Sequence, residues 1–307
     1  MLQPVITVVG SLNMDLVARS PRIPQPGETI IGGALLTAPG GKGANQAVAA
    51  AWLGAATAMV GKVGQDAFAA SLLHNLAEAN VDHTFVQQDA ATVTGAALIV
   101  VDDAGENSIV VTPGANYQLT PADIEAAETV ITTAKVLLLQ LEIPLDAVVK
   151  AAQMARSNGV TVILNPAPAQ ALPTELLKAV DILIPNETET ELLTGNPVSS
   201  QAEAELAAAK LRDQGVSTVI ITLGARGALL IDGNQSMLIP PFSVMPVDTT
   251  AAGDAFVGGL AVALAEGQPL PKAVRWGNAA GALTATKLGA QTSLPNRAAL
   301  LTKLKGD

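Results

Sequence analysis

Apolar runs rich in valine, isoleucine and leucine alternate along most of the chain with segments that have helical spacing. Five runs predict buried strands, at residues 5–10, 136–142, 160–165, 181–186 and 217–224. Three intervening segments have helical periodicity and end at glycine or polar stops, at residues 144–159, 174–180 and 200–215. This alternation favours an α/β fold in which helices flank both faces of a mostly parallel sheet.

Two regions depart from the alternation. Residues 14–20 and 28–37 predict a pair of strands, and residues 95–112 predict a hairpin that turns at 103–105. Four strands without intervening helices predict a small separate sheet attached to the α/β body.

The small sheet is expected to belong to the main domain. No change in composition marks a linker, and the glycine loop near residue 40 follows the first strand pair directly. The sequence therefore predicts one domain over residues 1–307, with a β lid formed by about residues 13–37 and 93–112.

Composition narrows the class of protein. The chain has 307 residues, of which 49% are hydrophobic, so it can bury a large core. The formal net charge of -10 argues against a nucleic-acid partner, because phosphate backbones bind basic surfaces. The absence of cysteine excludes a disulfide framework and a thiolate zinc site.

The sequence also predicts where the protein resides. The N-terminal part goes directly into an apolar strand-like run, without a basic region or a cleavage site, which predicts a cytoplasmic location. Residues 43–61 carry no charge, but they are mostly alanine and glycine and include Asn45 and Gln46. A membrane-spanning helix needs about 20 strongly apolar residues. The segment therefore predicts a buried helix followed by a strand, and no membrane partner.

Polar side chains follow several of the predicted strands, namely Asn13, Asp15, Glu142, Asn186 and Glu189. Ligands of open α/β sheets bind beyond the carboxyl ends of the strands. Turn and capping chemistry would account for any one of these residues. As a set they favour a ligand crevice at this edge of the sheet.

The stretch "PGGKGANQA" (39–47) is a glycine-rich loop that opens an alanine-rich predicted helix. It is not a Walker A loop, because no serine or threonine follows Lys42. It is not a dinucleotide fingerprint, because Gln46 occupies the third glycine position. Lys42 and Asn45 present a cation and an amide, which suit a polyhydroxylated ligand.

Two carboxylates, Asp248 and Asp254, bracket small residues in "DTTAAGDAF" (248–256), just before a predicted helix. Small side chains leave main-chain N–H groups bare, and such groups bind anions at the start of a helix. An anion site with an acid beside it, together with hydroxyl-binding amides, favours phosphoryl transfer. In that reaction Asp254 accepts the proton of the acceptor hydroxyl.

"GGKGANQA" and "DTTAAGDAFVGGLA" resemble the paired signatures of the PfkB carbohydrate kinase family. "NETE" (186–189) is similar to the N-x-x-E motif of that family. The resemblance covers essentially the whole chain in the right order. Within the family, "SLNMD" with "GGKGANQA" is similar to the members that phosphorylate ribose, rather than to fructokinases or adenosine kinases.

The resemblance implies a Rossmann-like α/β domain with a β-sheet lid that often forms a dimer interface, and so a homodimer. It implies that ATP and Mg²⁺ are used and that a pentose is the acceptor. The γ-phosphate would pass to the 5-hydroxyl of D-ribose, giving ribose 5-phosphate. The family members that phosphorylate ribose also use a monovalent cation beside the anion site, which implies K⁺.

The resemblance also assigns residues by motif. The sugar would be held by Asn13, Asp15, Gly41, Lys42, Gly43, Ala44, Asn45, Glu142 and Asp254. Catalysis would use Asp254 as the base, and the backbone of Ala251, Ala252 and Gly253. The nucleotide site would comprise Asn186, Thr222, Leu223, Gly224, Ala225, Arg226, Gly227, Gly253 and Asn278. The monovalent cation would lie among Asp248, Thr250, Thr284, Lys287, Gly289 and Ser293, with Glu189 holding Mg²⁺ indirectly. Asn278 stands where some family members have histidine.

Two alternatives stay open from the residues. One is a family kinase for another small sugar or a nucleoside; a phosphosugar would need extra cations, and Arg19 and Arg22 are close to Asp15 in sequence. The other is a non-catalytic sensor of sugar or nucleotide. The intact Asp254 argues against a sensor, because a pure binder needs no base at that position.

Overall fold

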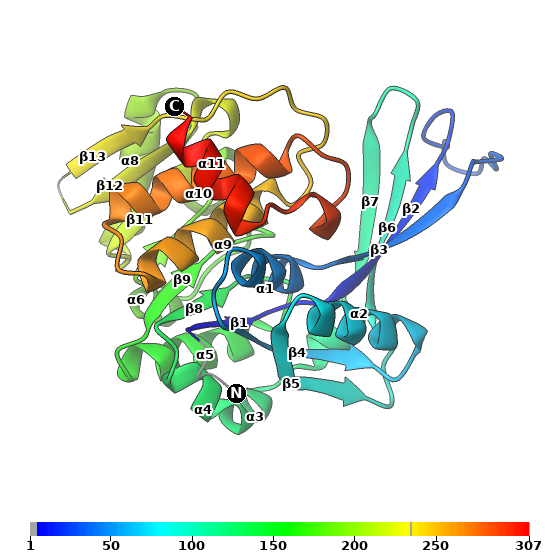
Figure 1. Cartoon of the computed structure of the whole chain (residues 1–307), viewed down its shortest axis with the longest axis horizontal. Coiled ribbons are helices and arrows are strands. Elements are labelled where there is room, and N and C mark those ends of the chain that lie inside the picture. The colour runs from blue at the N-terminus through cyan, green and yellow to red at the C-terminus, as the bar shows by residue number, and fades with distance from the viewer. Residues whose placement is uncertain (1–4, 234, 307) are drawn as a thin grey trace.

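The central sheet of the computed structural model, which describes residues 5–233 and 235–306, has nine strands (Figure 1). Their order across the sheet is β13 (Gln235–Ile239), β12 (Ala228–Asp232), β11 (Thr218–Thr222), β10 (Ile182–Leu183), β9 (Thr161–Leu164), β8 (Val136–Leu139), β1 (Ile6–Val9), β4 (Thr57–Gly64) and β5 (Val81–Asp89). The strands from β11 to β5 pair in parallel, and β12 and β13 pair antiparallel at one edge. The five strands predicted from the apolar runs all lie in this sheet. The shortest, β10, ends before Pro185, which has no N–H group to continue a ladder.

Helices cover both faces of the sheet. One core layer contains side chains of α1 (Lys42–Trp52), α2 (Ala67–Glu78), α9 (Ala252–Ala265), α10 (Leu270–Thr284) and α11 (Arg297–Lys305). The other layer is formed with α3 (Pro121–Ala126), α4 (Glu128–Thr132), α5 (Leu145–Ser157), α6 (Thr174–Ala179), α7 (Glu187–Thr194) and α8 (Gln201–Asp213). Side chains alternate between the layers along each strand: Leu138 packs in the first, and Leu137 and Leu139 pack in the second.

A second, smaller sheet projects beside α1 and α2 (Figure 1). Its order is β3 (Leu35–Gly40), β2 (Asn13–Arg19), β6 (Gly95–Val101) and β7 (Asn107–Thr112). As predicted, β2 pairs with β3 and β6 pairs with β7, each antiparallel, and β2 and β6 join them in parallel. The strand predicted at residues 28–37 corresponds to β3, and its predicted start at residue 28 is wrong, because β3 begins at Leu35. Gly32 and Gly33 precede β3, and glycine has no side chain to pack on a sheet.

Three short 3₁₀ helices, η1 (Gly114–Gln118), η2 (Gly224–Arg226) and η3 (Gln291–Ser293), complete the described elements. Residues 43–61 form the body of α1 and the start of β4, as the sequence predicted. Within residues 5–233 and 235–306, no helix is long and apolar enough to cross a membrane. The predicted fold class, a mostly parallel sheet flanked by helices with a small additional sheet, is confirmed.

The strand order places a crevice at the centre of the sheet. From β1 the chain continues to β4 and β5 on one side, and it reaches β8 on the other side only later. The connections that follow β1 and β8 therefore diverge at neighbouring carboxyl ends, where doubly wound folds bind ligands.

Candidate active site

The connections after β1 and β8 meet at Glu142. Its Oε2 accepts a hydrogen bond from the Ser11 hydroxyl and another from the backbone N–H of Lys42, at 3.1 Å. Gly41, just before Lys42, has a φ of 87°, and a Cβ there would lie 2.7 Å from the backbone nitrogen of Asn13. Only glycine therefore lets the start of α1 approach this connection.

The start of α1 packs closely on the backbone after β1. The N–H of Ala44 donates to the carbonyl of Ser11 at 2.9 Å, and a Cβ at Gly43 would lie 2.6 Å from the Ser11 nitrogen. Gly43 and Ala44 thus contribute backbone, while the polar side chains around them come from Lys42 and Asn45.

Two polar residues reach this region from β2. Asp15 lies against Gly40, where a Cβ would come 2.4 Å from its Oδ2. Asn13 is buried, and its Oδ1 accepts from Asn116 Nδ2 at 2.8 Å. Asn116 also exchanges hydrogen bonds with the backbone of Leu12, at 2.9 and 3.0 Å. The sequence analysis did not identify Asn116 as a site residue. The one feature of the sequence that could have indicated it is its place as a polar residue shortly after the hairpin of the small sheet.

The N-terminus of α9 opens toward a cavity. Ala251 at the N-cap has a left-handed φ of 58°, which costs a non-glycine residue about 1 kcal/mol or more. Its methyl group cannot cap the first turn. The Ala252 N–H donates to the Thr249 carbonyl at 3.1 Å, which leaves the N–H groups of Gly253 and Asp254 for an anion. A Cβ at Gly253 would meet no atom within 4 Å, so this position faces open space.

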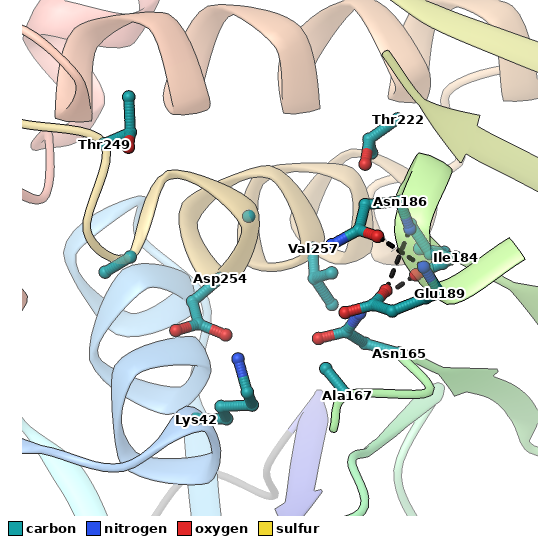
Figure 2. A pocket seen from close by; sticks show the side chains of 12 residues that line it. Lys42, Asn165, Ala167, Ile184, Asn186, Glu189, Thr222, Thr249, Asp254 and Val257 are labelled. Atoms are coloured by element: carbon teal, nitrogen blue, oxygen red, sulfur yellow. Dashed lines mark hydrogen bonds between the residues drawn. The ribbon is translucent and has the colours of Figure 1, made fainter. Parts of the chain in front are cut away.

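Asp254 lies at the third position of α9, is 5% exposed and lines a cavity of about 210 Å³. Its Oδ2 accepts from Asn45 Nδ2 at 2.9 Å, and its Oδ1 accepts from Gln46 Nε2 at 3.1 Å. Figure 2 shows the Lys42 side chain of α1 extending toward this carboxylate. The structure thus brings Asp254 beside Lys42 and Asn45, and Asp254 is 209 residues from Asn45 in sequence.

Charged groups in and around the smaller cavity shift the pKa values of one another. Burial, with Glu142 and Asp254 nearby, raises the pKa of Asp15 to about 7. Burial lowers the pKa of Lys42, but Asp254, Glu142 and Glu189 outweigh it, so the pKa lies above its usual value and the ammonium is charged. Burial raises the pKa of Glu189, although the backbone N–H of Asn186 and the Lys42 ammonium oppose the shift.

A larger cavity of about 670 Å³ adjoins the first one, and both are lined by Asn186, Thr222, Thr249 and Gly253. Of the predicted nucleotide residues, it is lined by Asn186, Thr222, Gly224, Ala225, Gly227, Gly253 and Asn278. Asn186, which lines both cavities, begins α7 with a capping box to Glu189, which lines the smaller one. These hydrogen bonds fix both side chains.

Two predicted nucleotide residues do not line this cavity. Leu223 is buried in the core, and the Arg226 guanidinium pairs with Glu187. Asn278 does line it, but its Nδ2 donates to the carbonyls of Ile239 and Pro240, at 3.2 and 3.0 Å. The Asn278 side chain therefore ties α10 to the segment after β13.

Hydrogen bonds join three of the six predicted cation positions, Asp248, Thr250 and Gly289. Asp248 Oδ2 accepts from the Gly289 N–H at 2.9 Å, and Asp248 Oδ1 accepts from the Thr250 N–H and hydroxyl, at 2.9 and 2.6 Å. Burial works against ionisation, but these hydrogen bonds lower the pKa of Asp248. The Lys287 N–H donates to the carbonyl of Thr284 at 3.1 Å. Thr284 and Ser293 are buried, and their hydroxyls donate to carbonyls of their own helices.

Comparison with known proteins shows the family of the chain. The model of the pfkB family carbohydrate kinases matches residues 3–297. A ribokinase from Haemophilus influenzae is 45% identical, over 96% of this chain and 97% of its own. A deoxyribokinase from Salmonella typhi is 38% identical, over 95% of each chain. The structure of Arabidopsis thaliana ribokinase complexed with ribose and ATP superimposes with a TM-score of 0.93 at 35% identity, over 100% of both chains.

Fold and site together define a phosphotransferase that acts on an alcohol group. The chain belongs to the pfkB family of carbohydrate kinases, as its two signatures predicted.

Proposed function

We propose that the protein transfers the γ-phosphate of ATP to the 5-hydroxyl of D-ribose, giving ribose 5-phosphate. The observation that carries the proposal is the Asp254 carboxylate, held by Asn45 at the N-terminus of α9 and facing a cavity that adjoins a larger one. The names of the relatives support ribose and ATP as the substrates.

Each part of the site has a place in this reaction. ATP occupies the larger cavity, with its γ-phosphate near Gly253, where the two cavities join. The sugar lies between α1 and β2, where Asn13, Asp15, Asn45 and Glu142 offer hydrogen bonds to its hydroxyls. Asp254 accepts the proton of the 5-hydroxyl as phosphate transfers.

Charge on the moving phosphate is stabilised by fixed dipoles. Ala251 and Gly253 line the smaller cavity at the positive end of α9, where their backbone N–H groups would face the phosphate, and the Ala252 N–H is held by the Thr249 carbonyl at 3.1 Å. The Lys42 ammonium adds a positive charge beside Asp254 (Figure 2). Because these groups are in place before reaction, little reorganisation accompanies charge development.

The donor sets suit two cations. Mg²⁺ binds in proteins through one or two carboxylates together with substrate phosphates and waters. Glu189, which lines the smaller cavity, fits an indirect role of this kind. A monovalent cation such as K⁺ suits Asp248 and the carbonyls around Thr250, Thr284, Lys287, Gly289 and Ser293, where it would order the approach to α9.

We further propose that the small sheet is a lid of the same domain, formed by about residues 13–37 and 93–112, and that it pairs two subunits. Its exposed apolar side chains are Leu35, Leu36, Leu98, Ile109, Val110 and Val111, between 46% and 64% exposed. They lie on both faces of the sheet, with Leu35, Leu98 and Val110 on one face and Leu36, Ile109 and Val111 on the other. Exposed apolar surface of this kind is typical of a subunit interface. The cytoplasmic location and the lack of a nucleic-acid partner stay predictions from the sequence.

A phosphosugar substrate is less well supported. The Arg22 guanidinium is paired with Glu28. Arg19 is four residues beyond Asp15 on β2, about 13 Å along an extended strand, and lies at the exposed end of the strand. Neither cation therefore lies beside the sugar-binding groups.

A coupled assay of ADP release tests the proposal, with ATP and a panel of pentoses, hexoses and nucleosides that includes 2-deoxyribose. We expect kcat/KM to be highest for D-ribose. A clearly higher kcat/KM for fructose 6-phosphate, adenosine or 2-deoxyribose would overturn the assignment of ribose and keep the kinase.

A further inference from the structure

Two buried glutamines form a chain of hydrogen bonds behind Asp254. Gln46, on α1, and Gln140, after β8, each have 0% of their surface exposed. Gln140 Nε2 donates to Gln46 Oε1 at 2.6 Å. Gln46 Nε2 in turn donates to Asp254 Oδ1 at 3.1 Å and to Asn165 Oδ1 at 3.3 Å.

The neighbours of Gln46 fix which way its amide points. An amide oxygen only accepts hydrogen bonds and an amide nitrogen only donates them. Because Gln140 donates to the oxygen of Gln46, the two N–H bonds of Gln46 are directed at Asp254 and Asn165. Asn165 Nδ2 donates to the carbonyl of Ile184 at 2.9 Å, so the Asn165 oxygen faces Gln46. A reversed Gln46 amide would place an oxygen against the Asp254 carboxylate.

The backbone leaves room for this chain. A Cβ at Gly10 would lie 2.0 Å from Gln140 Oε1, so glycine at the end of β1 lets the Gln140 side chain reach Gln46. Residues from α1, from the ends of β1 and β8, and from the segment after β9 thus converge on one oxygen of Asp254.

We infer that Gln46 is a positioning residue for the catalytic base, and that Gln140 and Asn165 act by fixing the orientation of the Gln46 amide. The inference rests on the proposed role of Asp254. With Asn45 on Oδ2 and Gln46 on Oδ1, the carboxylate is held at both oxygens, and each oxygen keeps a lone pair for the substrate hydroxyl. Small displacements of a catalytic group cost large factors in rate.

The test compares Gln46→Met and Gln140→Met, singly and combined, in steady-state assays with ribose and ATP. We expect each single variant to lower kcat by about 10–100-fold, the range typical of groups that orient a site. KM for ATP should change by less than about 3-fold, because nucleotide contacts are untouched. In the Gln46→Met background, Gln140→Met should change kcat by less than about 2-fold, because no amide remains to be oriented.

Two further variants separate positioning from stability. Thr7→Val is the matched control: it removes a buried hydrogen bond from Thr7 Oγ1 to the Val130 carbonyl, 2.7 Å long and directed toward α4. It should lower Tm and leave kcat unchanged. In an Asp254→Asn background, Gln46→Met should change the residual rate by less than about 2-fold, because the group that it positions is gone.

A folded Gln46→Met enzyme with kcat within about 2-fold of wild type would overturn the inference, and so would additive effects of the two glutamines. If Gln46→Met does not fold, Gln140→Met is the test, since Gln140 does not contact Asp254. A folded Gln140→Met enzyme with kcat within about 2-fold of wild type would then overturn the inference. Should wild-type protein prefer another sugar, the variants are measured with that sugar. Failure of the substrate assignment and failure of the positioning role therefore remain distinguishable.

Discussion

Replacing Asp254 by asparagine keeps the size of the side chain and one hydrogen-bonding oxygen, but removes the group that takes the proton. A positioned general base contributes about 10²–10⁴ in rate. We therefore expect Asp254→Asn to lower kcat at least about 10²-fold, equivalent to about 2.7 kcal/mol of transition-state stabilisation.

The structure also predicts a modest effect on stability. Asp254 accepts one hydrogen bond on each oxygen, from Asn45 and from Gln46. An asparagine amide accepts on its oxygen only, so its nitrogen meets one donor that loses its partner. A buried unpaired donor costs about 1–3 kcal/mol, which a domain of ordinary stability tolerates.

The measurements are kcat and KM from coupled ADP release, ATP affinity by calorimetry, and Tm. ATP affinity should change by less than about 3-fold, because the Gly253 backbone is unchanged. Asp66→Asn is the matched control, since Asp66 caps α2 by accepting from the Ala69 N–H at 2.9 Å, and asparagine caps nearly as well. A folded Asp254→Asn enzyme that keeps near wild-type kcat, like this control, would refute the role of Asp254 as base.

Four further outcomes follow from the site. K⁺ should stimulate kcat strongly relative to Na⁺, and Asp248→Ala should abolish most of that stimulation, because its carboxylate orders the loop before α9; equal rates in both salts at matched ionic strength would count against it. Ribose should protect residues 29–37 from hydrogen exchange, because the small sheet closes on hinges at the glycines near residue 40; unchanged exchange with saturating ribose would remove the hinge. Asn116→Ala should raise KM for ribose more than it lowers kcat, because it frees the Asn13 side chain; an unchanged KM would contradict this. Burial raises the pKa of Asp15 to about 7, so the folded protein retains a proton that the unfolded chain releases near pH 4. The free energy of unfolding should therefore fall as pH rises between about 4 and 7. Urea unfolding of Asp15→Asn should show a weaker fall, and a pH dependence identical to that of wild type would contradict the shift.

The sequence by itself determined the fold class and the local chemistry of the site. The spacing of apolar residues along a helix or strand reflects which of its faces is buried. This spacing predicted α5, α8 and the central strands. Small residues before Asp254 predicted bare N–H groups at a helix start, because that property depends only on neighbouring residues.

Tertiary structure decided where strands begin and end and which side chains meet. The start of β3 at Leu35 depends on pairing with β2, and Arg226 turns to Glu187 because α7 lies beside it. The residues around a side chain in the sequence do not indicate which distant side chain it will contact after folding.

Only the tertiary structure sets the orientation of the Asp254 carboxylate. Gln46 lies 94 residues from Gln140 and 208 residues from Asp254, and Asn116 lies 103 residues from Asn13. Along the sequence these are single polar residues in apolar or turn segments. Only the packing of α1 and α9 at the ends of β1 and β8 removes them from water, and their buried amide nitrogens then donate to side-chain oxygens of distant segments.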